Sequence, residues 1–201
     1  MKKLTGFICA IVLPFIPLGG KFLVKTGIFL SSSVVILFLP EKVNANSVDE
    51  YYDLGYLYKK NGKYSEAISV FTKVIEINPK DAMAYYNRGI LKNELKDYYG
   101  AIADYTKVIE INPKNADAYY NRGILKIELK DYYGAVADFT EAIQINPNDP
   151  NNIHNRGVVK ELIGDMSGAC SDWSKASYLG KRYSSILVKY KCWRNYFYFY
   201  F

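Results

Sequence analysis

Few residues of this chain could carry catalysis or bind a metal. His154 is the only histidine among 201 residues, and no cysteine or carboxylate lies at a metal-ligand spacing from it. The chain contains no glycine-rich phosphate loop, no His-Glu-x-x-His segment and no Gly-x-Ser-x-Gly segment. Glu94 and Glu128 recur at one point of an internal repeat, as solvated helix charges do. We therefore expect no enzymatic activity, no cofactor and no metal.

The cysteines predict one covalent bond. Cys9 lies in an N-terminal segment that we expect to be removed, which leaves Cys170 and Cys192. Two thiols in an exported protein readily form a bridge. Leu179-Gly180 allows the chain between them to turn back, which would place both cysteines at similar heights on antiparallel helices. A pair of buried free thiols remains the alternative, because free cysteine is often buried.

The charge distribution argues against a nucleic-acid partner. The net charge is +6, but the excess of Lys and Arg lies in residues 1–45 and 150–201. Residues 46–149 hold more acidic than basic side chains, and the two signs alternate. A protein that binds the phosphate backbone presents a continuous basic surface, which the middle of this chain does not supply.

The elements that position these residues repeat every 34 residues. Residues 82–115 and 116–149 are identical at 25 of 34 positions, a weaker copy covers 48–81, and a divergent copy covers 150–183. Each unit reads as two helices: in the second copy, about 82–95 and 98–111, with a turn at Lys96-Asp97 and an end at Asn112-Pro113. One such hairpin cannot bury its apolar side alone, so the units must stack.

The repeat resembles the tetratricopeptide repeat. The first unit carries that family's small, apolar and aromatic residues in phase, at Tyr51, Leu54, Gly55, Tyr58, Tyr64, Ala67, Phe71, Val74 and Pro79. The next two units depart from the pattern at Arg88 and Arg122, an Asn-Arg-Gly variant similar to repeats of cyanobacteria and some other bacteria. The resemblance implies an all-α fold, a right-handed superhelical solenoid of stacked helix hairpins.

The resemblance also implies where a partner would bind. In this family the first helices of the units line a concave groove. The matching positions combine aromatic, aliphatic and amide side chains, and we take as groove candidates Tyr52, Tyr56, Tyr86, Asn87, Ile90, Tyr120, Asn121, Ile124, His154 and Asn155. Such a set suits an extended or helical peptide. The alternative is that the Tyr and Asn side chains only fill the space between stacked helices, and that His154 is a packing residue.

Relatives that bind chaperone C-termini use a basic clamp in this groove. Here only Lys59 and Lys60 supply positive charge, beside Asp49 and Asp53, so we do not expect that role.

Arginine at a normally apolar position needs a partner. Three arginines recur in phase with three aspartates: Arg88, Arg122 and Arg156 with Asp104, Asp138 and Asp172. We predict a ladder of partly buried ion pairs between first helices and neighbouring second helices. The alternative is that each arginine extends to solvent along its own stem.

The N-terminal residues 1–45 differ in composition from the rest. Lys21 and Lys25 precede an apolar run over 26–39, and Val43-Asn44-Ala45 suits cleavage after Ala45, so we predict a secretory signal peptide. An uncleaved membrane anchor is the alternative, although the run is short for a bilayer. Either reading predicts an exported or membrane-anchored protein.

The C-terminal residues predict a cap. One further helix, read as about Arg182–Trp193 and assigned as a cap to 184–194, should cover the last repeat, and the aromatic tail 195–201 follows. Taken together, the sequence predicts a protein-interaction scaffold for an unknown protein or peptide. The alternative is a structural subunit of a membrane-associated complex that captures no peptide.

Overall fold

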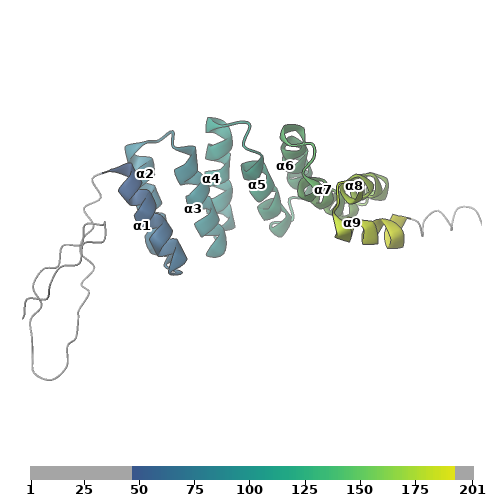
Figure 1. Ribbon diagram of the computed structural model, residues 1–201, viewed down its shortest axis with the longest axis horizontal. Helices are drawn as coiled ribbons and strands as arrows, with labels where there is room; N and C mark the ends of the chain where they lie inside the picture. The colour runs from purple at the N-terminus through teal and green to yellow at the C-terminus, as the bar shows by residue number, and fades with distance from the viewer. Residues whose placement is uncertain (1–46, 193–201) are drawn as a thin grey trace, which may run out of the picture. The chain divides into compact units, whose positions relative to one another are not determined.

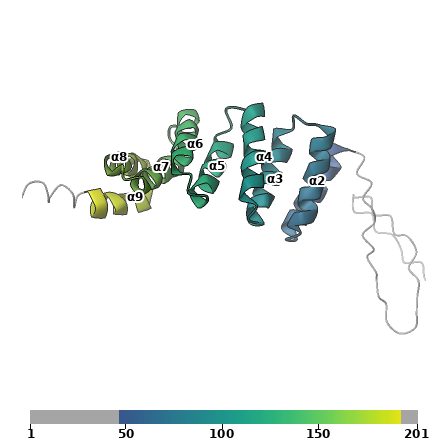
Figure 2. The ribbon, with the colours of Figure 1, turned by 180° about the vertical axis from the view of Figure 1, so that it is seen from behind.

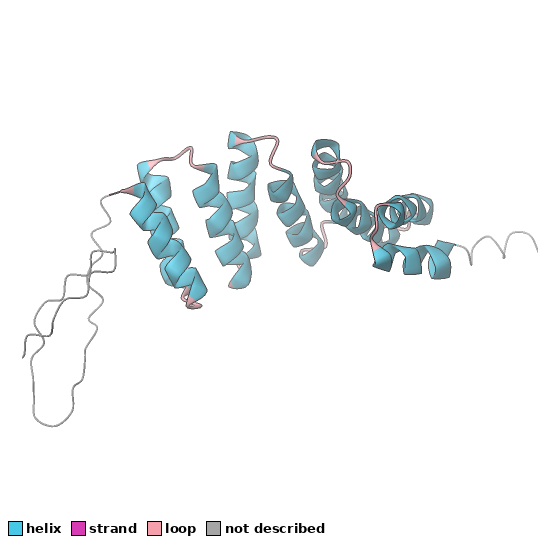
Figure 3. Ribbon diagram, viewed as in Figure 1, coloured by secondary structure: helices cyan, strands magenta, loops and turns pink. Residues whose placement is uncertain are grey.

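The computed structural model describes residues 47–192, and these residues form helices without strands. Short loops join the helices (Figure 3). The helices are α1 Val48–Lys60, α2 Tyr64–Ile77, α3 Ala82–Glu94, α4 Tyr98–Ile111, α5 Ala116–Glu128, α6 Tyr132–Ile145, α7 Pro150–Leu162, α8 Met166–Tyr178, α9 Arg182–Leu187 and the π-helix η1 Val188–Cys192. The signal peptide or anchor expected over 1–45 and the tail 195–201 lie outside the described residues.

Helix starts follow the sequence signals. Asp97, Asp131 and Asp165 accept hydrogen bonds from the backbone amides of the glycines three residues later, at the start of α4, α6 and α8. Asp81 and Asn115 cap α3 and α5 in the same way. Each capping side chain satisfies an amide that would otherwise lack a partner in the first helical turn.

The helices form two layers that run side by side along the array. The odd-numbered helices α1, α3, α5 and α7, here called the A helices, alternate with the B helices α2, α4, α6 and α8 (Figure 1). The B helices α2, α4 and α6 are in front when the array is seen from behind (Figure 2). Each A helix packs against its own B helix, and α3, α5 and α7 also pack against the B helix of the preceding unit. The fold is thus the expected solenoid.

The core repeats with the sequence. Leu91 of α3 is fully buried and packs with Ala67 and Phe71 of the preceding α2. Leu125 packs in the same way with Ala101 and Tyr105, and Val159 packs with Ala135 and Phe139. Gly89 lets α3 approach α4 closely, because a Cβ there would lie 3.0 Å from the Tyr105 ring. Every unit therefore uses its neighbour to bury its apolar side.

The turn inside each unit requires a left-handed backbone. Gly62 and Gly164 have φ of +71° and +86°, which glycine adopts without strain. The equivalent residues in the second and third units are Lys96 and Lys130, both with φ of 61°. These two lysines adopt a conformation that is unfavourable for a residue with a side chain.

The cap differs from the single helix expected over 182–193. A six-residue α-helix, α9, continues directly as the five-residue π-helix η1. Three polar contacts join this cap to α7, all with a separation of 30 residues: Lys181 to Asn151, Ser184 to His154 and Lys191 to Glu161. A constant separation means that the cap runs parallel to α7, as the A helix of a fifth unit would. Within residues 47–192, no helix combines the length and the apolar character needed to cross a bilayer.

Candidate protein-interaction surface

The A helices carry the predicted groove residues, and we call the side on which these residues lie the A-helix face. Tyr56 is 44% exposed on this face, and Met83, which belongs to the same set of positions, is 57% exposed. Asn87 and His154 are buried. The remaining candidates are half-buried: Tyr52, Tyr86, Ile90, Tyr120, Asn121, Ile124 and Asn155.

The asparagines of this face bind neighbouring tyrosines. Asn121 Nδ2 donates to the hydroxyl of Tyr86 at 2.9 Å, and Asn155 Nδ2 donates to the hydroxyl of Tyr120 at 3.2 Å. Asn87 Nδ2 donates to the backbone carbonyl of Met83 at 2.9 Å and lies 3.3 Å from the hydroxyl of Tyr56. Each asparagine therefore connects its A helix to the preceding one. The side-chain amide donors are therefore used in packing between stacked helices, which was the alternative considered from the sequence.

The tyrosine rings of this face are fixed from both sides. Tyr86 packs on Tyr105, and Tyr120 packs on Phe139, with ring centroids 5.8 and 5.9 Å apart. Burial, with the nearby carboxylate of Asp117, raises the pKa of Tyr86. Such tyrosines stay neutral, and their rings hold a fixed orientation on this face.

Tyr52 is the first residue of this tyrosine series. Its hydroxyl donates to Asp81 Oδ1 at 2.8 Å. Burial raises the pKa of Tyr52, and the hydrogen bond to Asp81 raises it further. Asp81 also caps α3, so this single contact ties α1 to the start of the next A helix.

His154 is not open to a partner, contrary to its place among the expected groove residues. It occupies the position of Tyr86 and Tyr120 in the fourth unit, but the cap covers it and leaves it 8% exposed. Its Nδ1 lies 2.8 Å from Ser184 Oγ, and its ring meets Tyr183 edge to face. Burial lowers the pKa of His154, and the charge of Lys181 lowers it further. The cap closes the face at this end because it stands where a fifth A helix would.

A hollow of about 350 Å³ opens at the other end of the face. Its walls come from α1, α2 and α3, and its lining residues are Tyr56, Lys59, Lys60, Tyr64 and Glu94. Both lysines that could attract a carboxylate thus lie here, next to one acidic side chain.

Further along, the exposed charges of the A-helix face are acidic. Glu94, Asp117 and Glu128 are all exposed on α3 and α5. Together with the exposed Met83, they give the middle of this face apolar and negatively charged side chains. A surface of this kind favours a partner that brings apolar and positively charged side chains.

The arginines lie against the aspartates with which they recur in phase. Arg122 Nε and Nη2 lie 3.0 and 2.7 Å from the two carboxylate oxygens of Asp138, on the B helix of the same unit. Its Nη1 donates to Thr106 Oγ1 of the preceding B helix at 3.0 Å. Arg88 and Arg156 repeat both contacts, with Asp104 and Thr72 and with Asp172 and Thr140. Each arginine thus joins three helices.

Sequence reasoning missed a second cation in each of these clusters. Lys92, Lys126 and Lys160 lie 2.8 to 2.9 Å from the same aspartates. Each lysine follows its arginine by four residues and therefore shares its face of the helix. That spacing was the available signal. The aspartates are buried, and two cations compensate each one.

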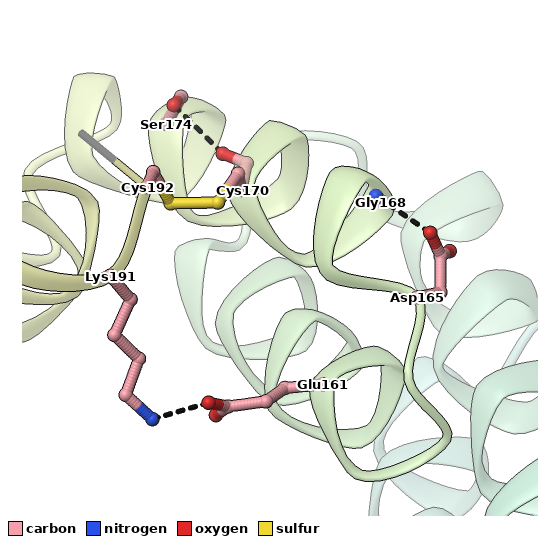
Figure 4. Close-up of a disulfide and its surroundings, with 7 residues drawn as sticks. All are labelled: Glu161, Asp165, Gly168, Cys170, Ser174, Lys191 and Cys192. Carbon is pink, nitrogen blue, oxygen red and sulfur yellow. Dashed lines mark hydrogen bonds and ion pairs between the residues drawn. A yellow bond between two sulfur atoms is a disulfide. The ribbon is translucent and has the colours of Figure 1, made fainter. Parts of the chain in front are cut away.

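The structure joins Cys170 of α8 to Cys192 of η1, with Cα atoms 5.7 Å apart (Figure 4). Lys191, beside Cys192, pairs with Glu161 of α7 (Figure 4). The end of the cap is therefore held by one covalent bond and one ion pair. Residues 47–192 contain no group of three His, Cys, Asp or Glu side chains that could hold a metal ion.

Comparison with protein families gave a match to one model. The tetratricopeptide repeat model matches residues 48–81, 82–115 and 116–149, which together make up half of the chain. A comparison with curated proteins found no match.

Solved structures share the fold. The crystal structure of MamA is similar with a TM-score of 0.66 and 24% identity, over 72% of this chain and 84% of that one. MamA 41-end from Desulfovibrio magneticus RS-1 gives a TM-score of 0.62 and 24% identity, over 67% and 76% of the two chains. The first tetratricopeptide repeat domain of Spaghetti (RPAP3), bound to the HSP90 peptide SRMEEVD, gives 0.56 and 24% identity, over 58% and 93%.

Proposed function

Because this chain belongs to the tetratricopeptide repeat family, we propose that it is a scaffold that holds a segment of a partner protein along its A-helix face. The family is a protein-interaction fold, and the repeats support a role in protein–protein interaction. The finer proposal, capture of a segment along this face, rests on the exposed side chains of α1, α3 and α5.

The observation that carries the proposal is the separation of two sets of residues on this face. The Asn and Tyr side chains stabilise the stacking of the A helices through their mutual hydrogen bonds. Met83, Glu94 and Glu128 are exposed, and their side chains take no part in the hydrogen bonds and ion pairs that join the units within residues 47–192. A partner can therefore bind to the exposed set while the array keeps its shape.

The chemistry of the exposed set indicates the partner. Met83 offers a flexible apolar contact, and the carboxylates of Glu94, Asp117 and Glu128 attract cations. We infer that the bound segment combines apolar residues with Lys or Arg. The RPAP3 domain was solved with a peptide rich in glutamate, which is the opposite chemistry. On the A-helix face of residues 47–192, the hollow beside Lys59 and Lys60 is the place that suits an acidic group.

Export is part of the proposal. A disulfide between Cys170 and Cys192 supports an oxidising compartment, which agrees with the signal peptide or anchor proposed for residues 1–45. Attachment to a membrane would depend on whether that segment is kept.

The test is a peptide array probed with the full chain and with a Met83→Lys/Glu94→Lys/Glu128→Lys variant. The expected result is binding to segments rich in Lys, Arg and apolar residues, lost in the variant. Glu141→Lys is the matched control, because Glu141 is exposed on α6 of the B-helix layer. Equal binding by all three proteins would refute the A-helix face as the site. No binding by the unchanged chain would favour the structural subunit instead.

A further inference from the structure

The first helix of the array lacks the neighbour that every later A helix has. Leu91, Leu125 and Val159 are buried against the B helix of the preceding unit. Leu57 occupies their position in α1 and is 53% exposed. Within the described residues, no helix precedes α1. We call Asp49, Asp53, Leu54 and Leu57 the head face.

The cap lacks a neighbour in the complementary way. Ser184 is fully buried and bonds to His154, just as Asn155 bonds to Tyr120 one unit earlier. Ile186 lies two residues beyond Ser184 on the exposed side of the cap, whereas Gly157, two residues beyond Asn155, contacts Trp173 of its own B helix. The cap is therefore an A helix whose B helix does not follow within residues 47–192.

The side that this B helix would cover is exposed and apolar. Tyr183, Ile186 and Tyr190 are 59, 46 and 64% exposed and recur at helical spacing. Arg182 and Lys189 are exposed beside them. We call these five residues the tail face. The cap is held firmly beneath it by the disulfide and the ion pair of Lys191 with Glu161 (Figure 4).

The two faces carry opposite charges. The head face has the carboxylates of Asp49 and Asp53, and the tail face has the cations of Arg182 and Lys189. Pairing two tail faces, or two head faces, would bring like charges together, which disfavours a symmetric dimer. Pairing a head with a tail brings together apolar side chains and opposite charges.

We propose that copies of this chain associate head to tail, with the tail face of one copy on the head face of the next. Such a contact is heterologous, so each bound copy still offers one free face, and the assembly can grow. The occupant of each end face is therefore a second copy of this chain. The A-helix face stays available along the assembly, so this proposal stands or falls separately from partner binding.

The test is sedimentation velocity of the full chain over a wide range of protein concentration. The unchanged chain should form species larger than a dimer as concentration rises. Leu57→Lys removes the head face and Ile186→Glu removes the tail face, so each variant alone should stay monomeric. A mixture of the two should give dimers and nothing larger, because Leu57→Lys keeps its tail face and Ile186→Glu keeps its head face.

Leu95→Lys is the matched control, since Leu95 is 47% exposed in the middle of the array, and it should assemble as the unchanged chain does. Circular dichroism shows whether each variant is folded. If a variant is not folded, Asp53→Arg and Arg182→Glu replace it: each should weaken assembly, and both together in one chain should restore it.

Several results would overturn the proposal. Dimers of Leu57→Lys alone would indicate pairing of tail faces. A monomeric unchanged chain at all concentrations, with a less stable Leu57→Lys variant, would indicate that residues 1–46 cover the head face. Assembly that persists in both variants, but disappears when 195–201 are deleted, would place the contact in the aromatic tail.

Discussion

His154 Nδ1 lies 2.8 Å from Ser184 Oγ, and this contact is the last of a series that joins successive A helices. The earlier members pair Tyr86 with Asn121 and Tyr120 with Asn155. In the fourth unit the tyrosine is replaced by the only titratable imidazole of the chain, and the asparagine by a serine of the cap. The contact between His154 and the cap is thus the one member of this series that contains a group able to take up a proton near neutral pH.

We expect the stability of the protein to fall as pH falls below neutral. Burial and Lys181 lower the pKa of His154 from its usual 6.5 in the folded state. The unfolded chain therefore takes up a proton at a pH where the folded chain does not, which favours unfolding. The contribution of His154 to the free energy of unfolding is complete above the pKa of this histidine in the unfolded chain. It is lost progressively as pH falls to the lower pKa of the same histidine in the folded chain. Urea unfolding at about pH 7.5 and about pH 5.5 measures it.

Carboxylates also titrate as pH falls, so the His154→Gln variant is the control. Its free energy of unfolding should vary less between the two pH values than that of the unchanged protein. Equal variation in both proteins would show that His154 does not contribute.

The arginine clusters should be strongly coupled. Asp138→Leu leaves Arg122 and Lys126 without their shared carboxylate, and we expect a loss of about 3–5 kcal/mol in the free energy of unfolding. Arg122→Leu/Asp138→Leu should lose less than the sum of the single changes, because the uncompensated charges are removed together. A double-mutant cycle by urea unfolding measures this coupling. Additive losses would mean that the pair does not interact in solution.

Lys96→Gly should stabilise the array. Lys96 has φ of 61°, and Gly62 and Gly164 occupy the same point of the first and fourth units. A left-handed conformation is unfavourable by about 1–2 kcal/mol for a residue with a side chain, and glycine removes this cost in the folded state. Glycine also gives the unfolded chain more conformational entropy, which offsets part of the gain. The net gain in the free energy of unfolding, measured by thermal unfolding, should be about 0.5–1 kcal/mol. Lys107→Gly, inside α4, is the control and should lose about 1 kcal/mol.

Removing the disulfide should loosen the cap first. The bond closes a loop with a sequence separation of 22, which the chain-entropy treatment values at about 3 kcal/mol. In Cys170→Ser/Cys192→Ser we therefore expect lower stability and earlier tryptic cleavage after Arg182 and Lys189 than elsewhere. Limited proteolysis followed by mass spectrometry tests the order. First cleavage within α3 to α6 would show that the cap does not depend on the bond.

The 34-residue periodicity of the sequence predicted those features of the structure that repeat from unit to unit. The 34-residue spacing of proline and glycine placed the helix pairs, and the in-phase recurrence of Arg88 and Asp104 indicated that they are partners. Helix boundaries agree to within a residue in the second unit, since Asp81 and Asp97 are capping residues that mark them.

Other features depend on how the helices are oriented in space, which the periodicity of the sequence does not specify. Whether Asn121 faces solvent or Tyr86 is decided by the angle between successive A helices, which no spacing encodes. The contact between His154 and Ser184 joins residues 30 apart, whereas the corresponding contacts of Tyr86 with Asn121 and of Tyr120 with Asn155 join residues 35 apart. His154 was therefore expected in the groove, although it lies under the cap.

The disulfide also determines how this protein would respond to a mechanical pull on its two ends. Tension would pass from α8 to η1 through the Cys170–Cys192 bond, and the segment between the two cysteines, whose sequence separation is 22, would bear no load. Fully extended, that segment would span about 70–80 Å. A single molecule stretched under oxidising conditions should therefore be shorter at full extension by about that length than the same molecule after reduction. The part of the chain that seats the cap would be the part that force does not unravel.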